Sequence, residues 1–234
     1  KNLVINKKYI LLLSLTFLTI FCFSQTEKKE NKKGDFSFLW GWNRSWYSNS
    51  DIHFSGSDYN FTLKNAVAND RQTKFDPAIY FHPKWITIPQ TNCRIGYFIT
   101  DNYEISLGLD HMKYVMLAYQ NTTISGEIAN NGPYAGVYSN EAIIIDTATF
   151  LQFEHTDGLN YINFELRRFD NIFTYKDFSL NITEGIGLGF LLPKTNSSLR
   201  FDFKERYDEF HFSGYGINSV IGINICYKKF FIQS

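Results

Sequence analysis

Phe36-Ser-Phe-Leu-Trp-Gly-Trp42 alternates aromatic side chains with small or aliphatic ones. A repeat of two residues is the repeat of a β-strand, in which successive side chains point to opposite faces of the sheet. A soluble sandwich buries a face that is usually aliphatic, whereas every even position of this stretch is aromatic. The pattern is typical of a strand that turns one face toward lipid.

Five further segments show the same alternation, with apolar residues on one face and small or polar residues on the other. Each is close to the roughly ten residues that a transmembrane β-strand needs. Glycines recur on the non-apolar face, which suits the crowded interior of a small barrel. Glu184 is a misfit, because it falls on the apolar face of its strand. The five segments are residues 91–100, 103–115, 159–169, 178–190 and 212–224.

Four charged residues fall on the non-apolar faces: Arg94, Glu104, Glu165 and Arg167. Buried charges are costly unless they are paired. Sequential strands are usually neighbours in a sheet, so the two arginines and the two glutamates can reach one another. We therefore predict that they form ion pairs in the lumen of a barrel.

The connections between the segments alternate in length. Short turns at 101–102, 170–176 and 227–229 alternate with long connections at 49–89, 118–156 and 191–210. Outer-membrane barrels have short periplasmic turns and long extracellular loops. The first strand is therefore expected to run outward from the periplasm.

The predicted fold class is all-β, as an antiparallel transmembrane β-barrel. Seven strands are present, and the seventh begins at Phe230 and is incomplete at Ser234. A barrel in lipid cannot leave an open edge, and single-chain bacterial barrels have an even number of strands. We therefore expect eight strands, the last one beyond Ser234. The alternative is a ten-stranded barrel with extra strands in 119–128 or 143–153, stretches that could equally form hairpins above the membrane.

The N-terminal residues are organised as an export signal. Lys7 and Lys8 precede an apolar run over 9–23, and Cys22 and Ser24 are small residues at the spacing of a cleavage site. The domain organisation that follows is an export signal over 1–24, a polar linker over 25–34 and the outer-membrane barrel over 35–234.

Two cysteines, Cys93 and Cys226, remain after cleavage of the signal. They lie near opposite ends of their strands, separated by the height of an apolar band of roughly 25 Å. A disulfide needs Cα atoms within about 7 Å, so we predict that these two cysteines do not pair.

Composition excludes several classes of protein. The 23 basic and 23 acidic residues balance to a formal net charge of zero, whereas a nucleic-acid-binding protein shows a basic excess or stripe. Aromatic residues make up 18% of the chain, which requires a large buried or lipid-facing surface. No spacing of histidines and cysteines indicates a metal site, and no glycine-rich loop opens a helix, so neither a metal nor a cofactor is expected.

Several stretches resemble a family of exported barrel proteins from Gram-negative bacteria of the Bacteroidota type. No activity is assigned to that family, so the resemblance implies the barrel and not a reaction, and it implies that the chain continues past Ser234. The resembling stretches cover most of the mature chain and are residues 57–63, 86–90, 109–114, 153–161 and 191–196.

Polar residues gather where strands are expected to end on the extracellular side. All five histidines fall there, with His53 and His82 in the first long connection. A histidine beside an acid can act as a general base, and a serine near it as a nucleophile. Polar loops are also ordinary features of a surface protein, which is the competing interpretation. The candidate catalytic residues are Asp110, His111, Glu154, His155, His211 and Ser213.

The predicted protein therefore resides in the outer membrane, where its partners are membrane lipid and lipopolysaccharide. Its function is structural or consists of presenting long extracellular loops to other molecules. The alternative is an enzyme that hydrolyses or transfers acyl chains of lipid A or phospholipid at the extracellular rim. A channel is disfavoured, because the lumen of eight strands is only wide enough for its own side chains.

Overall fold

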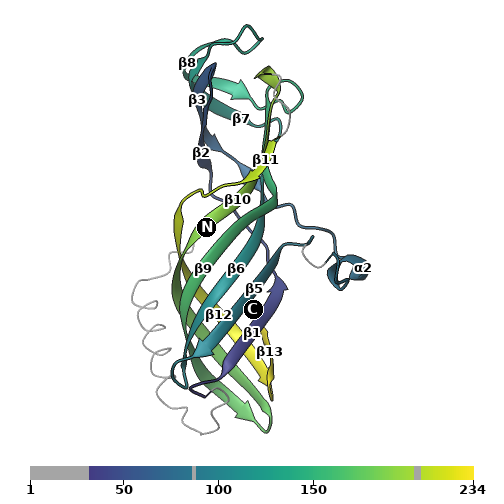
Figure 1. Ribbon diagram of the computed structural model, residues 1–234, viewed down its shortest axis with the longest axis vertical. Helices are drawn as coiled ribbons and strands as arrows, with labels where there is room; N and C mark the ends of the chain where they lie inside the picture. Colours follow the sequence, from purple (N-terminus) through teal and green to yellow (C-terminus); the bar gives the residue numbers. More distant parts are fainter. Residues whose placement is uncertain (1–31, 86–87, 203–206) are drawn as a thin grey trace, which may run out of the picture.

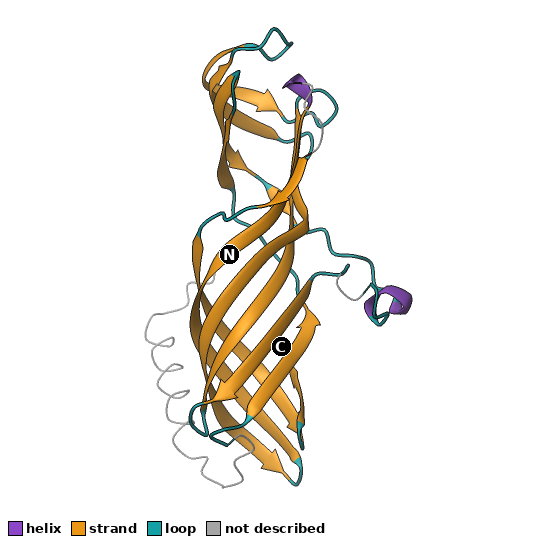
Figure 2. Cartoon of the chain, in the orientation of Figure 1, coloured by secondary structure: helices purple, strands orange, loops and turns teal. Residues whose placement is uncertain are grey.

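The computed structural model describes residues 32–85, 88–202 and 207–234. The predicted export signal and most of the polar linker lie outside these residues. The described chain is almost entirely strand, arranged in two antiparallel sheets that lie end to end (Figures 1 and 2). Its helical elements are α2 (Pro77–Tyr80) and the short 3₁₀ helix η1 (Arg200–Asp202). Neither these nor any other described segment forms a helix long and apolar enough to cross a membrane.

The larger sheet curls into a half-barrel in which neighbours along the chain are neighbours in space (Figure 1). Each of the seven segments expected to be a strand contributes one to the order β1-β5-β6-β9-β10-β12-β13. Two short strands, β4 (Ala68–Asn69) and β11 (Tyr207–Phe210), pair with β6 and β10. The seven strands are β1 (Phe36–Trp42), β5 (Thr91–Phe98), β6 (Tyr103–Met116), β9 (Leu151–Tyr175), β10 (Phe178–Leu199), β12 (Tyr215–Tyr227) and β13 (Phe230–Gln233).

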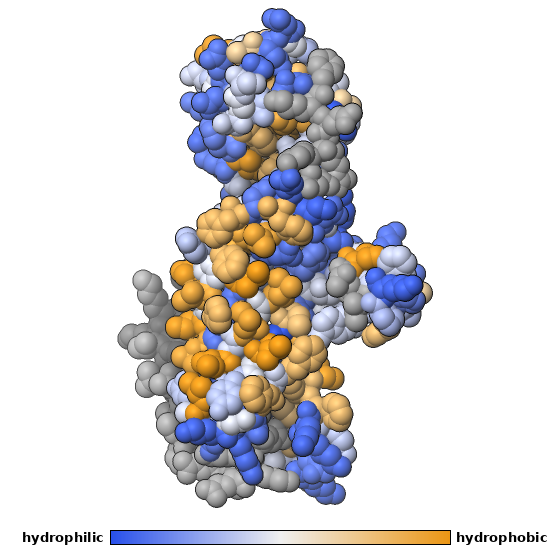
Figure 3. All heavy atoms as spheres, viewed as in Figure 1, coloured by the Kyte–Doolittle hydropathy of each residue, from blue (hydrophilic) through white to orange (hydrophobic). Residues whose placement is uncertain are grey.

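The half-barrel exposes apolar side chains and buries polar ones, which is the reverse of the arrangement in a soluble protein. Its convex face carries apolar side chains in the open, such as Ile217 at 92% and Ile221 at 88% exposure. Figure 3 shows them as a broad apolar surface on the lower part of the molecule. The concave face buries polar side chains, among them Asn163 and Thr183 at 0% exposure. An exposed apolar surface of this extent marks an interaction with lipid or with another protein.

Glu184, the misfit of the apolar face, lies opposite Arg168 of the neighbouring strand. Arg168 in turn pairs with Asp170, with Nη2 and Oδ1 at 2.9 Å, and its guanidinium lies over the ring of Tyr103. Opposite charges directly across a strand pair stabilise each other. The negative charge of Glu184 is therefore matched by the positive charge of Arg168 on the same face.

The second sheet is built from residues that the sequence assigned to long connections. Its order is β2-β3-β7-β8, and it stands beyond the outer ends of β6, β9 and β10 (Figure 1). The stretch 119–128 is indeed a strand, but it pairs with β3 and β8 and does not widen the half-barrel. We call these four strands the distal sheet: β2 (Ser50–Ser55), β3 (Tyr59–Ala66), β7 (Asn121–Ile128) and β8 (Gly136–Ile144).

Two long strands join the sheets. β9 has 25 residues and β10 has 22, whereas the sequence assigned only 159–169 and 178–190 to strands. Beyond the half-barrel their ends pack with the distal sheet around an apolar core that includes Phe61, Phe150 and Phe201. The sequence pattern did not reveal the full length of β9, because the pairing of β6 with β9 shifts register between Met112 and Tyr114. Such a bulge changes which face of the sheet the later side chains occupy.

A matched pair of glycines tests how tightly the concave face is packed. Gly189 and Gly216 are direct partners across β10 and β12. A Cβ at Gly189 would lie 2.2 Å from the backbone oxygen of Ile162, whereas one at Gly216 would lie 3.0 Å from the movable ring of Tyr161. We expect Gly189→Ala to destabilise the protein by about 1–3 kcal/mol and Gly216→Ala to have a much smaller effect. Urea unfolding of protein refolded in detergent measures both, and equal losses would contradict the packing described.

Candidate functional site

The concave face of the half-barrel holds a network of buried charges. Glu165 is 5% exposed and accepts from both Arg94 and Arg167: its Oε2 lies 2.9 Å from Arg94 Nη1 and also contacts Arg167 Nε. Its other oxygen, Oε1, accepts from Asn218 Nδ2 at 2.7 Å. Glu104, 4% exposed, accepts from the hydroxyl of Ser37 at 2.7 Å. The structure thus places the four predicted residues on one interior face. There Glu165 pairs with both arginines, and Glu104 is hydrogen-bonded to Ser37.

Asp110, one of the predicted catalytic residues, also belongs to this network. Its Oδ2 lies 3.7 Å from Arg94 Nη2 and accepts from Asn163 Nδ2 at 2.8 Å. Asn163 also accepts from Arg94 Nη2 at 2.9 Å, so it links the two charges. The alternation of segment 103–115 puts Asp110 on the interior face with Glu104 and Gly108, and the structure agrees. Because adjacent residues of a strand point to opposite faces, Asp110 is poorly placed to orient His111.

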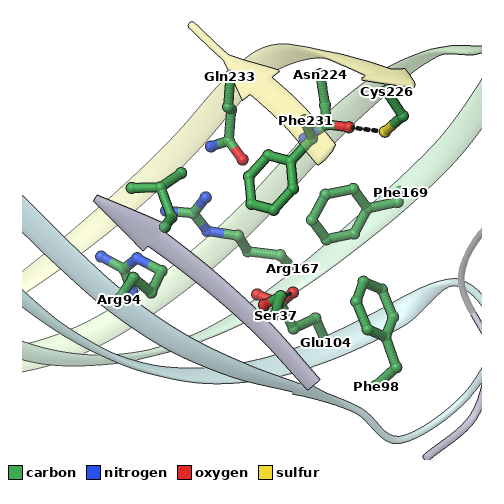
Figure 4. A pocket seen from close by; sticks show the side chains of 11 residues that line it. Ser37, Arg94, Phe98, Glu104, Arg167, Phe169, Asn224, Cys226, Phe231 and Gln233 are labelled. Atoms are coloured by element: carbon green, nitrogen blue, oxygen red, sulfur yellow. Dashed lines mark hydrogen bonds between the residues drawn. The ribbon is translucent and has the colours of Figure 1, made fainter. Parts of the chain in front are cut away.

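The interior is nearly filled by these side chains. A cavity of about 40 Å³ remains between the lower strands, lined by polar, charged and aromatic residues. Figure 4 shows Arg94, Arg167, Glu104 and Ser37 converging on it, with Phe231 and Gln233 of β13 on the opposite side. One buried water occupies at least 10–15 Å³ of such volume, so the cavity holds a few waters at most. It has the size of a packed interior and not of a conducting pore.

Glu154 lies at the outer end of the half-barrel, where it is 4% exposed. Its Oε2 is 3.0 Å from Arg71 Nη1, and its Oε1 accepts from Asn196 Nδ2 at 3.0 Å and from the hydroxyl of Thr156. These contacts tie β9 to β10 and to the segment that precedes α2. Because its charge is paired in this way, Glu154 serves as a junction between elements and does not orient a histidine.

His155, the next residue, packs among aromatic rings. Its ring centroid is 5.0 Å from Phe153 and 5.7 Å from Tyr114, and its Nδ1 is buried without a hydrogen-bond partner among the described residues. Burial lowers the pKa of His155 to about 4, and the nearby charge of His211 acts in the same direction. Two of the predicted histidines are therefore neighbours, but a carboxylate is not among the groups that determine the pKa of His155.

The remaining predicted residues each have a different neighbour. His111 Nδ1 lies 2.9 Å from Asn160 Oδ1, and His211 Nε2 lies 2.7 Å from the hydroxyl of Thr195. Ser213 is exposed, and its backbone N–H donates to Leu191. Within the described chain, the hydrogen bonds of these histidines go to neutral side chains. The hydrogen bonds and ion pairs of the six residues therefore lead to different partners, and a catalytic role for these residues stays a prediction.

The lowered pKa of the partly buried His155 predicts that stability depends on pH. In the unfolded chain a histidine titrates near pH 6.5, whereas in the folded protein the pKa is about 4. As pH falls between these values the unfolded state gains the proton first, so the folded state loses stability and the loss is complete below the folded pKa. We expect that His155→Phe removes much of the loss between about pH 7 and about pH 4, at most about 3 kcal/mol. Urea unfolding at the two pH values measures it. His53→Gln, at an exposed site, is the control and should keep the wild-type pH dependence.

Cys93 and Cys226 are not joined by a disulfide bond, which confirms the prediction that they do not pair. Among the described residues, no cluster of three or more His, Cys, Asp or Glu side chains is arranged to hold a metal ion.

Comparison with known proteins identifies no relative of this chain. It matches no protein-family model, no curated protein and no solved structure. The resemblance to an exported barrel family stays a prediction, and the function is inferred from the geometry of the two sheets.

Proposed function

We propose that this chain is an outer-membrane β-barrel protein that presents the distal sheet outside the cell as an interaction surface. The observation that carries the proposal is the reversed polarity of the half-barrel. Apolar side chains such as Ile217 are exposed on its convex face, while Arg94, Glu165 and Arg167 are buried within it. This is the arrangement of a sheet that is solvated by lipid outside and by its own polar groups inside.

Closure into an eight-stranded barrel is part of the proposal. β1 and β13 are the ends of the strand order, and residues of both line the same interior cavity. An open edge would leave backbone groups without partners in the hydrocarbon region. One further strand that pairs with both edges would satisfy them. Of the stretches considered for a ten-stranded barrel, 119–128 lies in β7 of the distal sheet, and 143–153 is divided between the end of β8 and the start of β9.

The direction of insertion is inferred from the two ends of the half-barrel. One end carries tight turns, such as Lys176–Asp177 between β9 and β10 and Lys228–Lys229 between β12 and β13. The other end carries the distal sheet and α2. Since short turns face the periplasm in bacterial barrels, the distal sheet faces outward.

Cysteine labelling of intact cells tests both location and direction. In a variant with Cys93→Ser and Cys226→Ser, we introduce Val137→Cys on β8, a site that is 77% exposed, or Lys229→Cys at an exposed turn. A membrane-impermeant maleimide should label Val137→Cys in whole cells and Lys229→Cys only after lysis. Migration of the outer-membrane fraction on gels with and without boiling reports the folded barrel. Recovery in the soluble fraction, or the opposite labelling pattern, would refute the proposal.

The contacts at the rim give no support to an acyl hydrolase or acyltransferase. We therefore expect lipid A to carry the same acyl chains in cells with and without the gene. Mass spectrometry of extracted lipid A makes the comparison, and a change in acyl chain number would establish the enzyme in place of the surface protein.

A further inference from the structure

A cluster of aromatic side chains projects beside the half-barrel, around α2. We call it the aromatic ledge, and it consists of Trp42, Phe75, Tyr80, Phe81 and Trp85. Four of its members are exposed: Phe75 at 69%, Phe81 at 62%, Trp85 at 48% and Trp42 at 39%. Figure 1 shows α2 standing out from the side of the half-barrel. Such side chains are rarely left in water together.

The ledge is held in place by contacts to the half-barrel. Tyr80 is buried, and its hydroxyl donates to the backbone oxygen of Thr73 at 2.6 Å. The ring of Trp42, on β1, lies 5.4 Å from Tyr80 and 5.6 Å from Phe81. Lys113 of β6 donates to the backbone oxygen of Ile88 at 2.8 Å. The exposed rings are therefore presented on a fixed support.

The ledge begins where the apolar convex face ends. Along β1, Phe36 and Phe38 are exposed on that face, and Trp40 and Trp42 continue it with rings 4.7 Å apart. Trp42 pairs with Thr91, the first residue of β5, so it lies at the outer border of the sheet. The aromatic side chains of β1 thus lead from the wall of the half-barrel to Tyr80 and Phe81 at the end of α2.

We propose that the aromatic ledge is a lipid-binding surface that lies in the interface between headgroups and acyl chains of the outer leaflet. This inference rests on the proposed function and adds a second contact with lipid outside the barrel wall. Aromatic side chains with one polar edge favour that level of a membrane. Lys74 and Lys84 are exposed in the same segment, where their charges suit anionic headgroups. Continuity with the apolar wall favours lipid over a protein partner.

Depth-dependent fluorescence quenching tests the ledge directly. A variant with Trp40→Phe, Trp42→Phe and Trp46→Phe retains Trp85 as its one tryptophan. It is reconstituted into phosphatidylcholine vesicles whose acyl chains carry bromine either near the headgroup or near the methyl end. We expect Trp85 fluorescence to be lost with bromine near the headgroup, and less so with deep bromine.

Two control variants also carry Trp85→Phe and receive a single tryptophan elsewhere. Ile217→Trp, on the convex face at 92% exposure, should be quenched by lipid, and Val137→Trp, on the distal sheet at 77%, should not. If Ile217→Trp is quenched while Trp85 is not, the ledge is not a lipid site although the barrel stands. Trp85 that is quenched neither by lipid nor by aqueous acrylamide would show that protein covers the ledge. If Ile217→Trp is also unquenched, the proposed function itself fails.

Discussion

Glu165→Leu is expected to lower the free energy of unfolding by about 3–5 kcal/mol, because it leaves buried arginines without their counter-charge. Arg94 and Arg167 share Oε2 of Glu165, and both are less than 10% exposed. Both arginines line a cavity of about 40 Å³, which holds too few waters to solvate them as bulk water would. Urea unfolding of protein refolded in detergent, monitored by migration on unboiled gels, measures the loss.

The double variant Glu165→Leu with Arg167→Met should be less destabilised than Glu165→Leu alone, since removal of both charges leaves fewer unpaired groups. Asp51→Asn is the matched control. It breaks an ion pair of the same length, 2.9 Å to Lys64 Nζ, between side chains that are 52% and 40% exposed. That change should cost much less than Glu165→Leu, because exposed ion pairs contribute little to stability. Additive losses in the double variant would show that the interior charges do not act as a network.

Phe61→Ala is expected to destabilise the distal sheet by about 3–5 kcal/mol, because it leaves a cavity in a small core. Phe61 is 1% exposed, and its ring centroid lies 5.2 Å from Phe54, 5.9 Å from Phe150 and 5.8 Å from Phe201. The three partners come from β2 and from the segments flanking β9 and β10. Loss of the ring therefore weakens the attachment of the distal sheet as well as its own packing.

Hydrogen exchange with mass spectrometry locates the effect. Amides of β3 and β7 should lose protection in Phe61→Ala, while those of β5 and β12 keep it, because local stability follows local packing. Val137→Ala, at a 77% exposed site of the distal sheet, should leave all four strands unchanged. Equal loss of protection in β5 and β12 would show that the two sheets unfold as one unit.

The half-barrel was predictable from sequence because its signal is local. A strand with lipid on one face and packed side chains on the other must alternate, so each segment could be found by itself. The interior pairing of Arg94 with Glu165 followed from the same alternation and from the order of the strands. Asp110 falls on the interior face by the same alternation, and in the structure it lies beside Arg94 and Asn163.

The distal sheet could not be assembled in the same way. Phe54, Phe61 and Leu63 do alternate with polar residues, but their strands are short and half exposed. β3 takes β7 as its partner although residues such as Leu63 and Ile124 are far apart in the chain. No local pattern encodes that choice of partner. It depends on a core that forms only when the ends of β9 and β10 are also present.

The length of β9 and β10 sets how far the distal sheet stands from the half-barrel. Residues 151–161 of β9 continue past Ile162, which lies level with Leu109 at the upper border of the apolar face. At 3.2–3.4 Å per residue this stretch spans about 35 Å along the strand. A hydrogen-bonded hairpin of that length is stiff, whereas loops of equal length would fold back. Under the proposed orientation, molecules too bulky to penetrate the surface sugar layer, such as antibodies or the tail fibres of a virus, would meet the distal sheet before they met lipid.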